Sequence, residues 1–196
     1  MSSASNRTNA STCRVFLRAP EFRDYEEFTD LKRASEEFHR PWSPVPPPGV
    51  DVYGEQAFAE FVRRNGMVHR RERMLVCRLE DKRILGVVNL NEIVRGSFQS
   101  AFLGYWIGAE FANQGYMGEA LRLVIEVAFE KLGLHRLEAN IRPENEASIR
   151  LVRRTGFKKE GFSPRYLQIA GDWCDHERWT ILADDEFEWE AESGPG

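Results

Sequence analysis

The sequence predicts a mixed α/β domain with a mostly antiparallel sheet, and the order of its elements carries that prediction. About seven short runs rich in β-branched and aromatic residues alternate with about four stretches of helical periodicity, in the order β-α-α-β-β-β-α-β-α-β-β. Three consecutive strands indicate an antiparallel meander, and the helices that separate later strands indicate crossover connections. The 196 residues fit one domain with short appendages, and a hydrophobic content of 42% excludes a disordered chain.

The first half is expected to combine the meander with two helices. A strand at residues 14–19 ends before Pro20. A polar helix with a thin apolar seam follows at 24–38, and a helix at 54–68 places three apolar side chains on one face. The strands of the meander are expected at 74–79, 84–90 and 101–107.

Between those two helices, residues 41–49 read Pro-Trp-Ser-Pro-Val-Pro-Pro-Pro-Gly. This composition is too rich in proline for a helix or a central strand, so we expect a loop that holds Trp42. A stiff linker and a loop that faces the substrate are both open interpretations.

The second half begins with the strongest amphipathic pattern of the chain. Apolar residues recur at i, i+3, i+4, i+7, i+8 and i+11 from Leu121 to Leu132, and Gly133 is expected to end that helix. The remaining elements are a strand at 135–141, a helix at 146–155 and strands at 157–169 and 173–182.

Both ends are expected to lie outside the domain, which spans residues 13–183. Residues 1–12 are rich in Ser, Asn and Thr and lack the apolar core of a secretory signal, which indicates a flexible tail. Residues 184–196 carry an acidic run, which indicates a solvated or disordered end.

Charge and cysteine content argue against several classes of partner. A net charge of −4 disfavours bulk attraction to nucleic acid or to an anionic membrane, and no apolar run is long enough for a transmembrane helix. Cys13, Cys77 and Cys174 are far apart and form no CxxC pair. They indicate free thiols in a reducing cytoplasm rather than a disulfide framework or a cysteine-rich zinc site, and no metal is predicted.

The most informative feature is a strand that ends in a glycine-bearing turn and opens a long helix, at residues 102–121. Free N–H groups at a helix N-terminus, with the helix dipole behind them, form an anion site suited to a pyrophosphate. Gly115 and Gly118 would let the ligand approach the main chain, although glycines placed for packing are the alternative. The chain has no GxxxxGK[ST] and no GxGxxG, which excludes a P-loop and a Rossmann fingerprint.

Two segments resemble the acyl-CoA site of the GNAT superfamily of N-acetyltransferases. Residues 112–117 are similar to its Q/R-x-x-G-x-G/A motif, with Ala112 where Gln or Arg is usual and Met117 where a small residue is usual. Residues 145–157 are similar to its N-x-x-(S/A)-x-x-L-x-x-x-x-G-F segment. Several matches in order between residues 14 and 183 are similar to the RimJ/RimL branch, the ribosomal-protein N-terminal acetyltransferases.

This resemblance implies a GNAT-like sheet with splayed central strands and acetyl-CoA as the co-substrate. Asn145 would hold the pantetheine arm and is also suited to cap a helix. Arg153 would meet a phosphate, with a solvated helix charge as the alternative. The residues implied to bind acetyl-CoA are Trp106, Ile107, Gly108, Ala112, Asn113, Gln114, Gly115, Tyr116, Met117, Gly118, Asn145, Ser148 and Arg153.

The resemblance also implies catalytic roles. A main-chain N–H within 106–108 would stabilise the oxyanion, and Ser148 would donate a proton to the departing thiolate. A polar residue in the first turn of a helix is the alternative for Ser148. Val152 stands where many relatives carry a tyrosine acid. Glu92 is the candidate base, with a surface carboxylate as the alternative, and His176 is expected to be structural or to line the pocket.

The function implied is the direct transfer of an acetyl group to an N-terminal α-amine. The RimJ/RimL resemblance implies that this amine belongs to a ribosomal protein. A small amine as acceptor (a polyamine, an antibiotic or an aminoacyl conjugate) and a non-catalytic acyl-CoA-binding module are the alternatives. A homodimer is left open, and no nucleic acid or membrane partner is expected.

Overall fold

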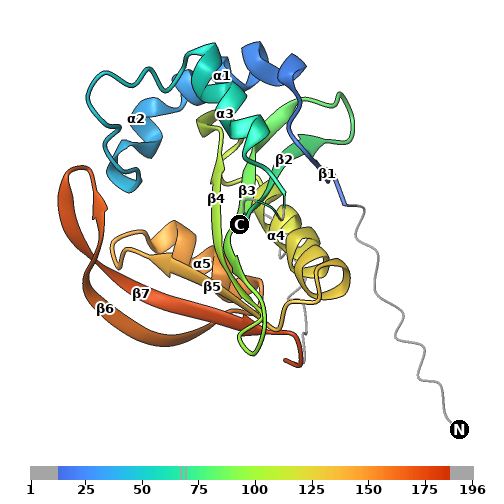
Figure 1. Cartoon of the computed structure of the whole chain (residues 1–196), viewed down its shortest axis with the longest axis vertical. Helices are drawn as coiled ribbons and strands as arrows, with labels where there is room; N and C mark the ends of the chain where they lie inside the picture. The colour runs from blue at the N-terminus through green and yellow to red at the C-terminus, as the bar shows by residue number, and fades with distance from the viewer. Residues whose placement is uncertain (1–12, 67, 69, 186–196) are drawn as a thin grey trace, which may run out of the picture.

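A sheet of seven strands forms the centre of the computed structural model, which describes residues 13–66, 68 and 70–185 (Figure 1). The strands lie in the order β1-β2-β3-β4-β5-β7-β6, and only the β4–β5 pair is parallel. They are β1 (Val15–Arg18), β2 (Glu72–Arg78), β3 (Ile84–Val94), β4 (Ser100–Ile107), β5 (Arg136–Ile141), β6 (Lys158–Ile169) and β7 (Asp172–Leu182). The predicted fold class, with its mostly antiparallel sheet, is confirmed.

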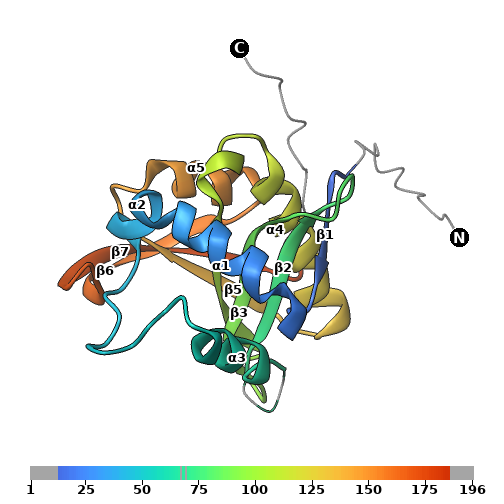
Figure 2. The same ribbon diagram turned by 90° about the horizontal axis from the view of Figure 1, so that it is seen from above.

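Helices cover both faces of this sheet (Figure 2). Within the described residues they are α1 (Tyr25–Ala34), α2 (Glu36–His39), α3 (Glu55–Arg63), α4 (Tyr116–Glu126) and α5 (Glu146–Arg154). Neighbouring residues of β4 reach different layers, since Trp106 contacts Phe28 of α1 whereas Tyr105 contacts Ser148 of α5. Because successive side chains of a strand point to opposite faces, α1 and α5 lie on opposite sides of the sheet.

The core lies mainly between the sheet and α4. Its fully buried side chains include Val76, Val88 and Leu90 of the meander, Leu121 and Val124 of α4, Leu137 of β5 and Ile181 of β7. The apolar stripe predicted for the helix after residue 115 therefore meets the sheet, and that helix also closes as predicted. Its last turn is a π-helix (Val127–Lys131), and Gly133 follows at φ +60°. No helix within the described residues has the length and apolar character to span a membrane.

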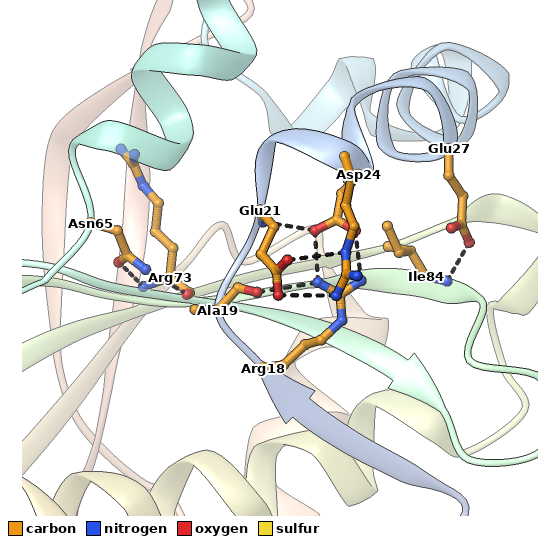
Figure 3. Close-up of polar contacts among 9 residues, drawn as sticks. Arg18, Ala19, Glu21, Asp24, Glu27, Asn65, Arg73 and Ile84 are labelled. Atoms are coloured by element: carbon orange, nitrogen blue, oxygen red, sulfur yellow. Dashed lines mark hydrogen bonds and ion pairs between the residues drawn. The ribbon is translucent and has the colours of Figure 1, made fainter.

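An ion pair joins the first strand to the first helices (Figure 3). The Arg18 guanidinium donates two hydrogen bonds of 2.7 Å to the carboxylate of Asp24, which is 5% exposed and also accepts from the Glu21 N–H. Burial by itself would raise the pKa of Asp24, but the bonds from Arg18 and Glu21, with the Arg18 charge, outweigh it and lower the pKa below its usual range. Glu27 connects α1 to β3, because its carboxylate accepts a hydrogen bond from the N–H of Ile84.

Two predicted helices are shorter than expected, and each ends at a polar side chain with a distant partner. The helix expected at 24–38 breaks at Ser35, whose buried hydroxyl accepts from the N–H of Ala109 at 2.9 Å. The helix expected at 54–68 ends at Arg63, because the Asn65 amide forms two hydrogen bonds to the main chain of Arg73 (Figure 3). Local periodicity cannot indicate either partner.

The domain boundaries are only partly described. The expected flexible tail at 1–12 and residues 186–196 of the expected acidic end lie outside the described residues. Asp185 is described, and it is held rather than solvated: its carboxylate pairs with Lys158 and accepts from the Leu182 N–H. The fold therefore extends two residues past the predicted end of the domain at 183.

Replacing Asp24 with Asn should lower the free energy of unfolding by about 3 kcal/mol at pH 7, because it leaves Arg18 without its buried partner. The folded pKa of Asp24 is lowered, so its contribution is fully present above the unfolded value of about 3.9 and is lost as the pH falls through the folded value. Urea unfolding at pH 7 and pH 3 measures both effects. Asp30→Asn, at a 77% exposed site on α1, is the control; an equal loss in both variants would contradict the assignment.

Candidate active site

The central feature is the place where β4 and β5 separate. Their parallel pairing covers three residue pairs, from Ser100–Arg136 to Phe102–Glu138. Beyond it β4 continues beside β3, and β5 continues beside β7. A cavity of about 230 Å³, which we name the strand gap, opens between them. Its wall includes Trp42, Gly104, Tyr105, Asn140, Ser148 and His176.

Main-chain groups at the end of β4 point alternately toward β3 and away from it. The N–H of Gly108 donates to Leu85 on β3 at 2.7 Å, whereas the carbonyl of Ile107 accepts from His39 Nε2 at 2.8 Å. Since main-chain groups alternate along a strand, Ile107 is the member of the predicted trio 106–108 whose N–H is directed away from β3. Trp106 itself lies in an aromatic cluster with Phe28 and His39.

The turn that is predicted to bind an anion contains left-handed residues and opens a helix. The turn after β4 passes through two left-handed residues, Asn113 (φ +59°) and Gly115 (φ +84°), and α4 begins at Tyr116. The N–H of Glu119 is the first to find a helical acceptor, at Gly115, so the four N–H groups of 115–118 have none within the helix. The side chain of Met117 is buried in the core, so this departure from the motif does not cover the amides.

Arg14 holds this turn from the start of β1. Its main-chain N–H and Nε donate to the Glu119 carboxylate at 2.6 and 2.7 Å, and its Nη2 donates to the carbonyl of Gln114 at 2.9 Å. The Gln114 side chain is used within the turn, because it donates to the carbonyl of Glu110. Arg14 and Glu119 were not singled out from the sequence, and no local signal connects positions 105 residues apart.

The short helix α5 brings Asn145 and Ser148 to the strand gap. Asn145 caps the helix by accepting from the Ser148 N–H at 3.1 Å, and the Ser148 hydroxyl lies 2.5 Å from the hydroxyl of Tyr105. Burial raises the pKa of Tyr105 to about 12, against a smaller opposing effect of the bond to Ser148. The phenol is therefore protonated at neutral pH and can supply a hydrogen to Ser148.

Tyr105 supplies a phenol beside Ser148 that the motif does not predict. Val152, which stands where a tyrosine acid is usual in the resembled family, is fully buried in the core. The phenol comes instead from the middle of β4, outside both motif segments. Arg153, the predicted phosphate ligand, is exposed on the last turn of α5. That helix lies against the start of α4, since a Cβ on Gly118 would stand 3.7 Å from Leu151.

The structure does not bring Glu92 to the strand gap. Glu92 has φ +47° and lies in a bulge of β3. The bulge is beside the part of β4 that is still paired with β5. The Glu92 side chain is 53% exposed and lies 3.5 Å from Arg71. This is the surface carboxylate that the alternative interpretation describes, and we do not retain Glu92 as the base.

The proline-rich segment covers one mouth of the strand gap. Arg142 donates to the carbonyl of Pro41 and lies over the Trp42 ring, at 5.6 Å from its centroid. The carbonyl of Ser43 accepts from the N–H of Ala170 between β6 and β7. These bonds favour the interpretation of a loop that faces the substrate over that of a stiff linker.

The cysteines form no bond with one another. Cys77 is buried, Cys174 is partly buried and Cys13 is exposed, and all three are free thiols as predicted. Among the residues that the structure describes, no group of three or more His, Cys, Asp or Glu side chains could hold a metal ion.

Comparison with known proteins identifies the class of this site. The model of the Acetyltransferase (GNAT) domain matches residues 14–158. The [ribosomal protein uS5]-alanine N-acetyltransferase of Escherichia coli is 35% identical over 177 residues, which cover 87% of this chain and 88% of that protein. A probable N-acetyltransferase of Bacillus subtilis, YjcK, is 42% identical over 106 residues, but the match spans 59% of its length.

Solved structures give the same result. The RimJ of Mycobacterium smegmatis, solved in complex with CoA-disulfide, superposes with a TM-score of 0.80. It is 27% identical, and the match covers 86% of this chain and 82% of that one.

Replacing Gly115 with Ala should weaken the binding of CoA about 5- to 30-fold, because a left-handed residue with a Cβ costs about 1–2 kcal/mol and relief of that strain would turn the amides away. Isothermal titration calorimetry measures the affinity. Gly133→Ala is the matched control, since Gly133 also has a positive φ but lies at the other end of that helix. An unchanged affinity in Gly115→Ala would contradict the role of this turn.

Proposed function

Because the chain belongs to the GNAT acetyltransferase family and is an N-acetyltransferase, we propose that it transfers the acetyl group of acetyl-CoA to the α-amine of a protein N-terminus, with a ribosomal protein as the acceptor. The single observation that carries the reaction is the strand gap, where an oriented serine and a protonated phenol lie within hydrogen-bond distance of each other. The cytoplasm, where ribosomal proteins are made, is the proposed place of this reaction.

The wall of the strand gap favours this class of acceptor over a polyamine. Arg142 is a cationic member of that wall, and no Asp or Glu belongs to it among the described residues. A polyamine carries several positive charges and requires carboxylates to replace its lost hydration. Spermidine N-acetyltransferases of Vibrio cholerae share the fold at 22–23% identity, which supports the architecture alone.

In the proposed reaction, the diphosphate lies against the amides of 115–118 and the thioester arm enters the strand gap. The Ile107 N–H is then available to the thioester oxygen as it becomes an oxyanion. Ser148 donates a proton to the departing thiolate, and the Tyr105 phenol restores that proton through their 2.5 Å hydrogen bond.

A protein N-terminus also suits a site without a strong base. An N-terminal α-amine has a pKa of about 7.7–8.0, so about a tenth of it is neutral near pH 7. A lysine side chain, with a pKa of about 10.4, is almost fully charged there. The site therefore has to remove a proton that is weakly held.

The purified protein should acetylate peptides that begin with Ala or Ser in preference to spermidine or an aminoglycoside. Release of free CoA, with mass spectrometry to locate the acetyl group, measures this preference. The same peptides with a blocked N-terminus and an internal lysine are the control. Turnover of spermidine but of no peptide would contradict a protein acceptor, and binding of acetyl-CoA without turnover of any acceptor would contradict an enzyme.

Ser148→Ala should lower kcat about 100-fold with little change in CoA affinity, because the serine acts on the leaving group. Tyr105→Phe should also lower kcat, and the double variant should be about as slow as Ser148→Ala alone, since the two hydroxyls act as one unit. Single-turnover rates of the four proteins measure this coupling. Ser97→Ala, at an exposed turn, is the control. Additive losses would contradict the proton path.

A further inference from the structure

We propose that the His176 imidazole takes the proton that the acceptor amine loses, and this proposal rests on the function proposed above. His176 lies on β7, is 2% exposed and forms part of the wall of the strand gap, the same cavity to which Ser148 and Asn145 belong. With Glu92 outside that cavity, a proton acceptor on the amine side is the one chemical role that the arrangement still lacks.

The hydrogen bonding of the ring determines which nitrogen can act. His176 Nδ1 lies 3.0 Å from the carbonyl of Cys174. A carbonyl oxygen only accepts, so Nδ1 carries the hydrogen and, in the neutral ring, Nε2 carries the lone pair. No described residue is paired with Nε2. A ring that is oriented by a main-chain carbonyl, in a residue of the cavity wall and with no described partner on its basic nitrogen, has the arrangement of a general base.

A second acceptor lies beside it on the neighbouring strand. Asn140 Nδ2 donates to a Glu138 oxygen at 3.1 Å, which sets the orientation of the amide because a carboxylate cannot donate. The other end, Oδ1, is buried and has no partner among the described residues. Asn140 is directly opposite Arg178, two positions from His176, so both side chains leave the same face of the sheet.

These two acceptors match the hydrogens of a primary amine. Asn140 Oδ1 accepts one N–H and holds the nitrogen, while Nε2 of His176 accepts the hydrogen that is lost. A buried acceptor without a partner is costly in a folded protein, and an amine in the strand gap would supply the missing donor.

The proton and electron balance of this step is complete. The amine lone pair forms the C–N bond, the electron pair of the C–S bond leaves with sulfur, and the nitrogen proton passes to His176 Nε2. The thiolate takes its proton from Ser148, which regains one from Tyr105. The phenol is reprotonated from solvent and His176 releases its proton to solvent, so no net proton is gained or lost. The products are the N-acetyl amine and free CoA.

Glu138 is less suited to this role, although it is the nearest carboxylate along β5. Arg136 donates to it at 2.8 Å and Asn140 donates to its other oxygen. Glu138 does not belong to the wall of the strand gap. The Glu138 carboxylate is therefore already paired with Arg136 and Asn140, and it orients Asn140 rather than contacting the amine.

His176→Asn tests the proposal, because Asn can still donate to the Cys174 carbonyl but has no counterpart of Nε2. For an Ala-starting peptide at pH 7 we expect kcat to fall at least 30-fold, with unchanged affinity for acetyl-CoA. The same substitution at the exposed His135 is the matched control and should leave kcat unchanged. A kcat of His176→Asn within threefold of the wild type would overturn the proposal.

A pH series separates this role from a structural one. The deficit of His176→Asn should shrink between pH 7 and pH 9, because the amine becomes neutral without help. The titratable and charged groups around His176 are Arg142 after β5, Arg178 on β7 and the Tyr166 ring on β6, at 6.0 Å. A deficit that is the same at every pH would count against proton transfer.

A measurement on the wild type keeps the proposal testable if the variant does not fold. Nitrogen-15 NMR should show the Nδ1–H tautomer of His176, and a covalent CoA–peptide adduct should shift its Nε2 resonance. An unshifted Nε2 in the bound adduct would overturn the assignment. If the wild type turns over no amine at all, the proposed function fails, whereas a fast His176→Asn variant refutes this inference alone.

Discussion

The pairing of β4 with β5 ends after three residue pairs, and the rest of the site depends on that limit. Both strands remain fixed beyond it, because β4 stays bonded to β3 and β5 to β7. Their facing edges therefore cannot close on one another, and main-chain groups such as the Ile107 N–H have no partner strand on that side. Unpaired strand edges inside a domain are unfavourable unless something else satisfies them. A ligand that runs between the strands can make these bonds, and an extended pantetheine arm has the required shape and amide groups.

Polar groups reach this opening from both faces of the sheet, and tertiary contacts position each of them. On the face of α4 and α5, α5 presents Ser148 against Tyr105. On the opposite face, Asn140 and His176 project from neighbouring strands. Polar groups on two faces suit a reaction between two substrates. Each face can bind one substrate, and the new bond forms in the opening between the two faces.

Sequence patterns predicted correctly the features that depend on neighbouring residues. The stripe from Leu121 to Leu132, the stop at Gly133 and the cap at Asn145 agree with the structure, because each depends on residues within one or two turns. The break at Ser35 and the Arg14–Glu119 pair depend on partners far along the chain, so no window of sequence contains them. Glu92 follows the strand expected at 84–90, whereas a bulge extends β3 through it to Val94. The chemistry of Tyr105 and His176 depends on their hydrogen bonds, and these exist only in the folded sheet.

The attachment of Arg14 has a practical consequence for handling this enzyme. The chain enters the domain at the residue whose own main-chain N–H and guanidinium hold Glu119. A tag that ends directly before Arg14 would thus lie beside the surface expected to receive the coenzyme diphosphate, and a truncation that removes Arg14 would leave Glu119 without this partner.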